Sequence, residues 1–150
     1  MNTKLVNSIE AVARSRLVTI SADALLLDAA QLLSDTHISL VVVCNHDGAM
    51  VGVITKTNIV QEIGRCGQSA CTIPVADVMT RDVTYCRPTD DLHGVLSMMA
   101  KRGLVHIPVV DEHSKPSGVV NARDALGALM VEHKDEASLL RDYIMGIGYR

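Results

Sequence analysis

The chain has 150 residues, of which 48% are hydrophobic and 21% are charged, and its formal net charge at pH 7 is −3. These values are typical of a globular domain with its own core, and they exclude an intrinsically disordered chain. With 14 basic against 17 acidic residues and with no Trp or Phe, the chain lacks a polyanion-binding surface and aromatic stacking platforms, so we expect no direct nucleic-acid ligand.

No stretch of the sequence predicts export, a membrane span or a metal site. Residues 1–16 are too polar for a signal peptide, and no segment reaches the ~18 uninterrupted apolar residues that a membrane span needs. We therefore expect a cytoplasmic protein without membrane contact, in which the cysteines are reduced thiols. Cys66 and Cys71 have loose zinc-ligand spacing, but no second close pair of Cys or His completes a four-ligand set, so we expect no metal.

The first half of the chain predicts a β-α-β-β-α unit over residues 15–65. An amphipathic helix over residues 1–14 precedes it, and the unit then opens with the β-branched piece RLVTIS. A helix follows, and then the apolar run SLVVVC has the length and composition of a strand that is covered on both faces. The turn at 45–48 leads into the strand MVGVI, and a second helix is expected from Thr57.

The second half repeats this unit over residues 77–130. Gly118 opens GVVNARDAL as Gly52 opens GVITKTNIV, 66 positions earlier, and residues 94–109 match residues 28–43 at the same spacing. Aligning Thr84 with Thr19 gives a spacing of 65 at the start of the repeats, one less than the 66 found further along. This difference predicts one inserted residue near Arg87 in the second copy. The first helix of this copy is expected to begin with Thr89 as its N-cap and to bury a stripe of apolar residues at helical spacing, namely Leu92, Val95, Leu96 and Met99.

Two copies of this unit suggest how the core is closed. A single copy has one apolar sheet face and two apolar helix stripes with too few partners, whereas two copies packed face to face cover them. We therefore predict an α/β (α+β) fold of two packed repeats. Residues 66–76 are expected to form the linker, and residues 131–150 a C-terminal helix, near 136–145, and a tail.

In this order, several motifs resemble those of a tandem pair of cystathionine-β-synthase (CBS) domains, also called a Bateman module. They are VADVMTRDVTYCRP at the entry to the second copy, HIPVVD on its central strand, and GVITKTN and GVVNARD in the two copies. The resemblance implies pseudo-two-fold symmetry, two clefts between the repeats, a homodimer, and a sensor of adenosine-containing ligands such as AMP, ADP, ATP, S-adenosylmethionine or NAD. It implies no catalysis and no required cofactor.

The resemblance also assigns residues to two ligand-binding clefts. Cleft one is expected to comprise Ser15, Ile20, Ser39, Leu40, Asn121, Arg123 and Asp124. Cleft two is expected to comprise Thr55, Lys56, Thr57, Asn58, Thr80, Val105 and His106. In chemical terms, a carboxylate accepts from both hydroxyls of a ribose at once, and an adjacent guanidinium pairs with phosphate oxygens.

Both clefts depart from the family pattern, in complementary ways. Asn121 stands where Thr or Ser is usual in cleft one, and Asn58 stands where Asp is usual in cleft two. Because an amide accepts through one oxygen without charge assistance, we expect cleft one to be the better site. The alternative for Asp124 and Asn58 is a helix-capping role, and the alternative for His106 is a core histidine with a satisfied hydrogen bond.

Three functional hypotheses follow from the sequence. The first is a regulatory module that binds an adenine nucleotide and signals to a separate, unidentified partner chain, with residues 138–150 as candidate partner or dimer contacts. The second is a structural dimerisation scaffold with clefts that bind nothing. The third is a small enzyme, for which Cys44 near His46 and Cys86 near His93 are the best candidate residues, without an ordered nucleophile, base and orienting group.

Overall fold

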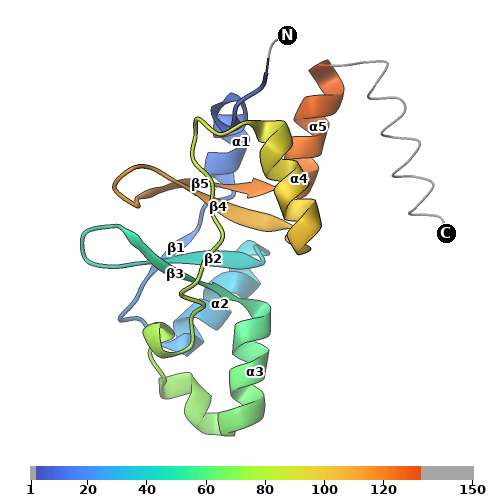
Figure 1. The fold of residues 1–150 in the computed structure, drawn as a ribbon. Coiled ribbons are helices and arrows are strands. Elements are labelled where there is room, and N and C mark those ends of the chain that lie inside the picture. Colours follow the sequence, from blue (N-terminus) through green and yellow to red (C-terminus); the bar gives the residue numbers. More distant parts are fainter. Residues whose placement is uncertain (1–2, 133–150) are drawn as a thin grey trace, which may run out of the picture.

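The two predicted repeats are present, stacked sheet to sheet with their helices outside (Figure 1). The computed structural model describes residues 3–132, apart from the side chains of residues 68, 70, 71 and 132. The predicted helix near 136–145 and the tail lie outside the described residues. The first repeat contains β1 (Thr19–Ser21), α2 (Leu26–Thr36), β2 (Leu40–Cys44), β3 (Met50–Thr55) and α3 (Lys56–Cys66). The second contains α4 (Leu92–Arg102), β4 (His106–Val110), β5 (Pro116–Asn121) and α5 (Ala122–Glu132).

The strand register corrects the predicted spacing of the repeats. In the first repeat β1 runs parallel to β2, with Ile20 opposite Val43, and β2 pairs antiparallel with β3. In the second repeat β4 pairs antiparallel with β5, and the expected first strand is reduced to one parallel bridge between Cys86 and Val109. Because Cys86 stands opposite Val109 as Ile20 stands opposite Val43, the spacing is 66 here as well, and the predicted insertion near Arg87 is wrong.

The predicted N-cap of α4 is also wrong. Asp91 is the N-cap, and its carboxylate accepts from the Gly94 N–H at 3.0 Å. Thr89 lies two positions earlier, inside a turn in which the Asp90 carboxylate accepts from the Arg87 N–H at 2.8 Å. A residue can cap a helix only where the first free N–H groups are within reach, and the turn brings Asp91 to that place.

The segments that precede the two repeats are exchanged between them. The Leu92 N–H at the start of α4 donates to the Lys4 carbonyl at 2.9 Å, and the Leu26 N–H at the start of α2 donates to the Ile73 carbonyl at 2.8 Å. Each segment therefore pairs with the other repeat's first helix. In place of the helix expected over residues 1–14, this segment contains a 3-10 turn, η1 (Val6–Ile9), and a six-residue helix, α1 (Glu10–Ser15).

The expected linker contains two short 3-10 helices and joins the repeats without interrupting the stack. They are η2 (Gly67–Thr72) and η3 (Val75–Asp77). Between the two sheets lies a layer of buried side chains from both repeats, made of Leu40, Val42, Val53 and Val119. Because β2 and β5 both contribute to this layer, the repeats share one buried interface, and the clefts open at its edges.

Candidate functional site

One cavity lies between the two repeats at the place expected for cleft one. Its volume is about 230 Å³. Its walls come from the segment before β1, the start of β2, the start of β4 and the end of β5. The lining residues are Arg16, His37, Ile38, Ser39, Leu40, His106, Val119 and Asn121. Three predicted cleft-one residues, Ser39, Leu40 and Asn121, are thus brought together.

A bidentate ion pair joins the edge of this cavity to α5. Arg16 donates through Nε to Asp124 Oδ2 at 2.9 Å and through Nη2 to Asp124 Oδ1 at 3.0 Å. The side chain of Asp124 is 12% exposed and that of Arg16 is 45% exposed. Hydrogen bonding to Asp124, followed by its charge, raises the pKa of Arg16 above its ordinary value. Both oxygens of Asp124 thus accept from Arg16, a side chain that lines the cavity.

His106 and Asn121 form the second polar pair of the cavity. Asn121 Nδ2 lies 3.0 Å from His106 Nε2, and Asn121 Oδ1 accepts from the Arg123 N–H at 2.8 Å. Because the amide oxygen is held by the start of α5, the NH₂ group faces the imidazole, and Nε2 must accept. Burial lowers the pKa of His106, Arg16 lowers it further, and the charge of Asp124 opposes this in part. His106 is thus held as a neutral acceptor.

The remaining predicted residues of cleft one lie around this cavity in other roles. The exposed Ser15 hydroxyl donates to the Val12 carbonyl at 2.6 Å, which ends α1. Ile20 lies on β1 and packs against the core of the first repeat. Arg123 is exposed on the first turn of α5. Ser15, Ile20 and Arg123 therefore do not line the cavity, although Ser15 and Arg123 directly precede Arg16 and Asp124 in the chain.

The residues of predicted cleft two are arranged differently. Thr55 is the N-cap of α3, and Asn58 Oδ1 accepts both from the Thr55 N–H and from the Thr55 hydroxyl, each at 2.9 Å. The Asn58 NH₂ group donates to Thr80 Oγ1 at 3.3 Å. The structure thus brings together Thr55, Asn58 and Thr80. In this arrangement the Asn58 side-chain amide takes part in the capping box of α3.

Of the other four predicted residues of cleft two, three are exposed and one lines the cavity of cleft one. Lys56 and Thr57 are exposed in the first turn of α3, and Val105 is 58% exposed. His106, assigned to cleft two by the resemblance, lines the cavity of cleft one. Leu40 and His106 occupy equivalent positions at the starts of β2 and β4, 66 residues apart, and both line this one cavity.

Comparison with known proteins identifies the fold family. The family model described as CBS domain matches the chain twice, over residues 9–65 and 75–131. The chain belongs to the CBS domain family. A CBS-domain protein from Agrobacterium tumefaciens is 25% identical to it, with a TM-score of 0.71 over 83% of this chain and 98% of that one. A CBS domain pair crystallised with 5′-methylthioadenosine and S-adenosyl-L-methionine is 22% identical, with a TM-score of 0.71 over 88% of this chain and 100% of that one.

The curated relatives of this CBS domain pair differ widely in length. A 17.7 kDa protein of Acidianus ambivalens is 22% identical over 144 residues, which are 96% of this chain and 86% of the relative. The next two relatives are 24% and 25% identical, and the match spans 61% and 22% of their lengths. The pair therefore occurs both in small proteins and as a part of much longer ones.

Two residues of the candidate site were missed by sequence reasoning. Arg16 binds Asp124, although only its neighbour Ser15 was selected. His37 lines the cavity in the left-handed backbone conformation, with φ of 57° at the C-cap of α2, where the second repeat has Gly103. The basic residue at the start of the predicted strand segment RLVTIS gave a weak signal for Arg16, and the departure from Gly between equivalent positions gave one for His37.

The environments of Cys44 and Cys86 do not suit nucleophilic chemistry. Burial raises the pKa of Cys86 to about 12 and also raises the pKa of Cys44. A thiol attacks as its thiolate, so neither group is activated at neutral pH. His46 contacts Asp23 at 3.3 Å on an exposed turn. Within the described part of the chain, no group of three or more metal-binding side chains gathers, and no helix is long and apolar enough to cross a membrane.

Proposed function

We propose that this CBS domain pair is a regulatory module that binds an adenosine-containing ligand, such as AMP, ADP, ATP, S-adenosylmethionine or NAD, in the cavity between its repeats. The observation that carries this proposal is the Arg16–Asp124 pair beside a cavity walled by the starts of β2 and β4. It places a carboxylate suited to a ribose next to a guanidinium suited to a phosphate.

Ligand entry requires the ion pair to open. The cavity of about 230 Å³ is smaller than the roughly 300–1,000 Å³ that is common for small-molecule sites, so a nucleoside must displace a wall residue. Arg16 is the half-exposed wall residue, and the ribose hydroxyls can replace its two hydrogen bonds to Asp124. The released guanidinium is then free to pair with the phosphate of a nucleotide.

This exchange also supplies a route for signalling. Arg16 directly follows α1, and α1 packs against β5 of the second repeat, while β1, three residues further on, belongs to the first repeat. Moving Arg16 therefore acts on the connection between the repeats. A ligand that favours the open arrangement shifts the population toward it, and a partner chain that contacts either repeat can detect the change.

Structures with the same fold make the ligand class reasonable. The CBS pair mentioned above was crystallised with 5′-methylthioadenosine and S-adenosyl-L-methionine. The cytosolic domain of a Mg²⁺ channel, 22% identical to this chain with a TM-score of 0.63, was crystallised with ATP. Both compounds in the first structure and the one in the second contain an adenosine unit, which supports adenosine as the common element to be tested here.

The proposal is tested by a thermal-shift panel of adenosine compounds on a reciprocal pair of variants. A ligand at 100 times its dissociation constant should stabilise the parent by about 2.7 kcal/mol. Asp124→Asn removes the charge-assisted acceptor and should weaken binding about tenfold, which corresponds to ~1.4 kcal/mol. Asn58→Asp places a carboxylate in cleft two and should raise the stoichiometry measured by calorimetry from one ligand to two.

Two results would contradict this assignment. Unchanged melting temperatures with every compound would exclude adenosine binding. Equal affinities of the parent and Asp124→Asn would exclude Asp124 as the ribose acceptor. Asn58→Asp serves as the matched control, because it makes the opposite change at the equivalent position and keeps an acceptor for the Thr55 N–H.

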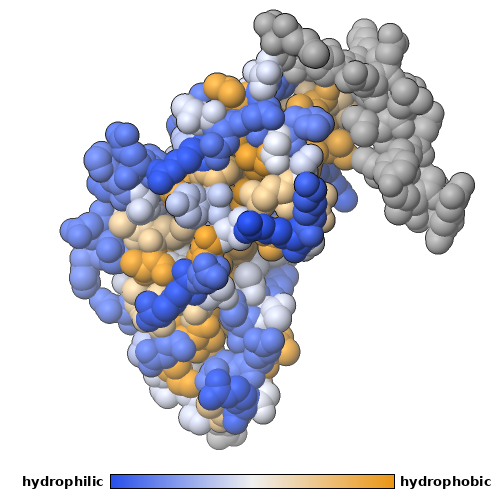
Figure 2. Space-filling model, in the orientation of Figure 1, coloured by the Kyte–Doolittle hydropathy of each residue, from blue (hydrophilic) through white to orange (hydrophobic). Residues whose placement is uncertain are grey.

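The structural scaffold is the second candidate, and a specific observation favours it. The polar groups expected to bind ribose are already occupied, Asp124 by Arg16 and Asn58 by Thr55. Moreover, α2 and α3 expose Leu27, Val60 and Ile63, with exposed fractions of 52%, 67% and 54%. Hydrophobic side chains reach the surface at this end of the molecule (Figure 2). Such a surface fits the homodimer that we propose in either case.

A further inference from the structure

Arg16 supplies the permanent positive charge of the cavity of cleft one. Among the described residues that line this cavity, Arg16, His37 and His106 are basic and none is acidic. Burial and the charge of Arg16 lower the pKa of His106, which is therefore neutral at pH 7, and His37 is exposed. A guanidinium stays charged at any pH at which proteins fold. The charge that a ligand meets inside this cavity is thus that of Arg16.

The closed ion pair balances this charge, and only Asp124 does so. Asp124 accepts both hydrogen bonds from Arg16, at 2.9 and 3.0 Å. In the described part of the chain, Asp124 is also the only acidic group that raises the pKa of Arg16. When ribose hydroxyls replace Arg16 on Asp124, no second carboxylate is present to hold the guanidinium. The ligand itself must then balance the charge of Arg16, because an unpaired charge in a cavity is unfavourable.

The group on the 5′ carbon of the ribose decides whether a ligand balances this charge. A 5′-phosphate forms a bidentate, charge-assisted pair with the guanidinium and so replaces the carboxylate that Arg16 has lost. The thioether of 5′-methylthioadenosine is neutral, and its sulfur is only a weak hydrogen-bond acceptor. The sulfonium of S-adenosyl-L-methionine places a second cation at the same carbon. Only a phosphorylated ligand therefore compensates for opening the ion pair.

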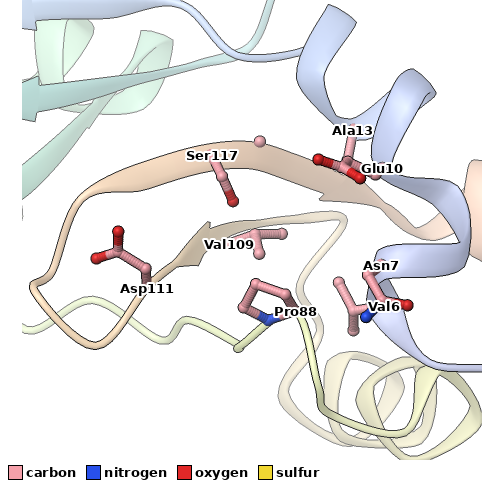
Figure 3. Close-up of a pocket in the computed structure, with 9 residues that line it drawn as sticks. Val6, Asn7, Glu10, Ala13, Pro88, Val109, Asp111 and Ser117 are labelled. Atoms are coloured by element: carbon pink, nitrogen blue, oxygen red, sulfur yellow. The ribbon is translucent and has the colours of Figure 1, made fainter.

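The main chain before Arg16 is anchored on β5, which keeps the guanidinium within reach of the ligand. Ala13 is 4% exposed, and Figure 3 shows it on α1, close to β5. An added Cβ on Gly118 would lie 2.8 Å from the Ala13 backbone carbon, so α1 and β5 are in close contact. The Arg16 N–H donates to the Ala13 carbonyl at 3.2 Å. The Arg16 side chain can therefore leave Asp124 by rotating, while its main chain stays beside the cavity.

Cleft two has the opposite charge at the equivalent position. The spacing of 66 residues, which the strand register supports, puts Asp82 at the position of Arg16 and Asn58 at the position of Asp124. Asp82 is exposed. A carboxylate thus stands where cleft one has its guanidinium, and a neutral amide stands where cleft one has its carboxylate. The two clefts therefore differ in the charge that they present to a phosphate.

The other cavity of the second repeat does not compete for an anionic ligand. Its volume is about 240 Å³, and it lies between α1 and the β4–β5 hairpin (Figure 3). Its charged lining residues, Glu10 and Asp111, are both acidic. Because carboxylates repel a phosphate, a nucleotide should favour the cavity that Arg16 lines.

We propose that Arg16 selects the ligand of cleft one by charge, so that the cavity binds adenosine nucleotides with a 5′-phosphate in preference to neutral and cationic adenosine compounds. This inference rests on the proposed function and narrows its ligand class. In the empty state Arg16 occupies the ribose acceptor Asp124, and in the bound state it pairs with the phosphate. A ligand without a phosphate must displace Arg16 from Asp124 and gains no pairing in return.

The test compares AMP with 5′-methylthioadenosine by calorimetry on the full chain of the parent and of Arg16→Gln. The two compounds share adenine and ribose and differ only at the 5′ carbon. We expect the parent to bind AMP about tenfold more tightly, as one charge-assisted pair provides. Arg16→Gln should bind AMP about tenfold more weakly than the parent does, because the phosphate loses its partner. It should bind 5′-methylthioadenosine about threefold more tightly, because Asp124 is no longer held by a guanidinium.

Two further variants separate charge from folding. Arg16→Lys keeps the charge without the planar fork and should keep the preference for AMP. Arg14→Gln makes the same change as Arg16→Gln at a side chain that is 68% exposed and pairs with Glu10, and it should bind both compounds as the parent does. Equal affinities of the parent for both compounds would overturn the inference and leave adenosine binding intact. An unchanged preference for AMP in Arg16→Gln would also overturn it. If neither compound binds to the parent, the proposed function fails and this inference fails with it.

Discussion

Gly118→Ala is expected to destabilise the fold, whereas Gly64→Ala should stabilise it. A Cβ on Gly118 would lie 2.8 Å from the Ala13 backbone carbon and 2.9 Å from the Ala13 carbonyl oxygen, so α1 would have to move away from β5. Overpacking of this kind costs typically about 1–3 kcal/mol, and the loss of glycine's freedom in the unfolded chain returns about 0.4–1 kcal/mol. The net loss should be about 1–2 kcal/mol.

Gly64 is the matched control because the same change meets no obstacle there. It lies inside α3, and nothing stands within 4 Å of an added Cβ. Alanine in an exposed helix interior is favoured over glycine by about 0.5–1 kcal/mol. For a protein of this size, 1 kcal/mol shifts the melting temperature by roughly 2–4 °C, so the two variants should melt on opposite sides of the parent.

Differential scanning calorimetry at a fixed protein concentration measures both shifts. The change at Gly118 should also disturb the proposed nucleotide cleft, because α1 ends at Ser15 and Arg16 follows it to bind Asp124. A Gly118→Ala protein that melts at or above the parent's temperature would refute the packing argument, since it would show that α1 and β5 do not need to approach at glycine distance.

Three further outcomes are expected. Because the pKa of His106 is lowered in the folded protein, the unfolded chain takes up this proton first as the pH falls, so the histidine should reduce the free energy of unfolding below its ordinary pKa of 6.5 and not well above it. Denaturant titrations should show that the free energy of unfolding falls less between about pH 7.5 and about pH 5.5 in His106→Gln than in the parent. An equal fall in both proteins would contradict the reasoning. Ile63→Asp should convert the proposed dimer to a monomer, as measured by sedimentation. Val131→Asp, at another exposed apolar residue, should leave the dimer intact. A dimer that persists in Ile63→Asp would exclude α3 from the interface. Cys86 is buried and its pKa is raised to about 12, so it should react with iodoacetamide only after unfolding and later than Cys66. Mass spectrometry follows the labelling of each cysteine. Fast labelling of Cys86 in the native protein would contradict this expectation and show that the core opens.

The repeated unit and its apolar strands were readable from the sequence because they depend on local pattern. The runs SLVVVC and HIPVVD predicted β2 and β4, and the β-branched residues after Gly52 and Gly118 predicted β3 and β5. The two errors in the second repeat have separate origins. A β-branched match between Thr19 and Thr84 suggested the wrong register, which the bridge between Cys86 and Val109 corrects, and the N-cap preference of Thr favoured Thr89 although Asp91 lies at the start of α4.

The chemistry of the clefts was decided by tertiary structure alone. Arg16 and Asp124 are 108 residues apart in the chain, and only the exchange of the N-terminal segment onto the second repeat brings them to 2.9 Å. In the same way, only the folded chain shows that the Asn58 amide oxygen accepts hydrogen bonds from Thr55, and that Met79 approaches Gly52 while the Ala13 backbone approaches Gly118. The physical reason is that periodicity reports which face of an element is buried, while the partner that buries it depends on how distant segments pack.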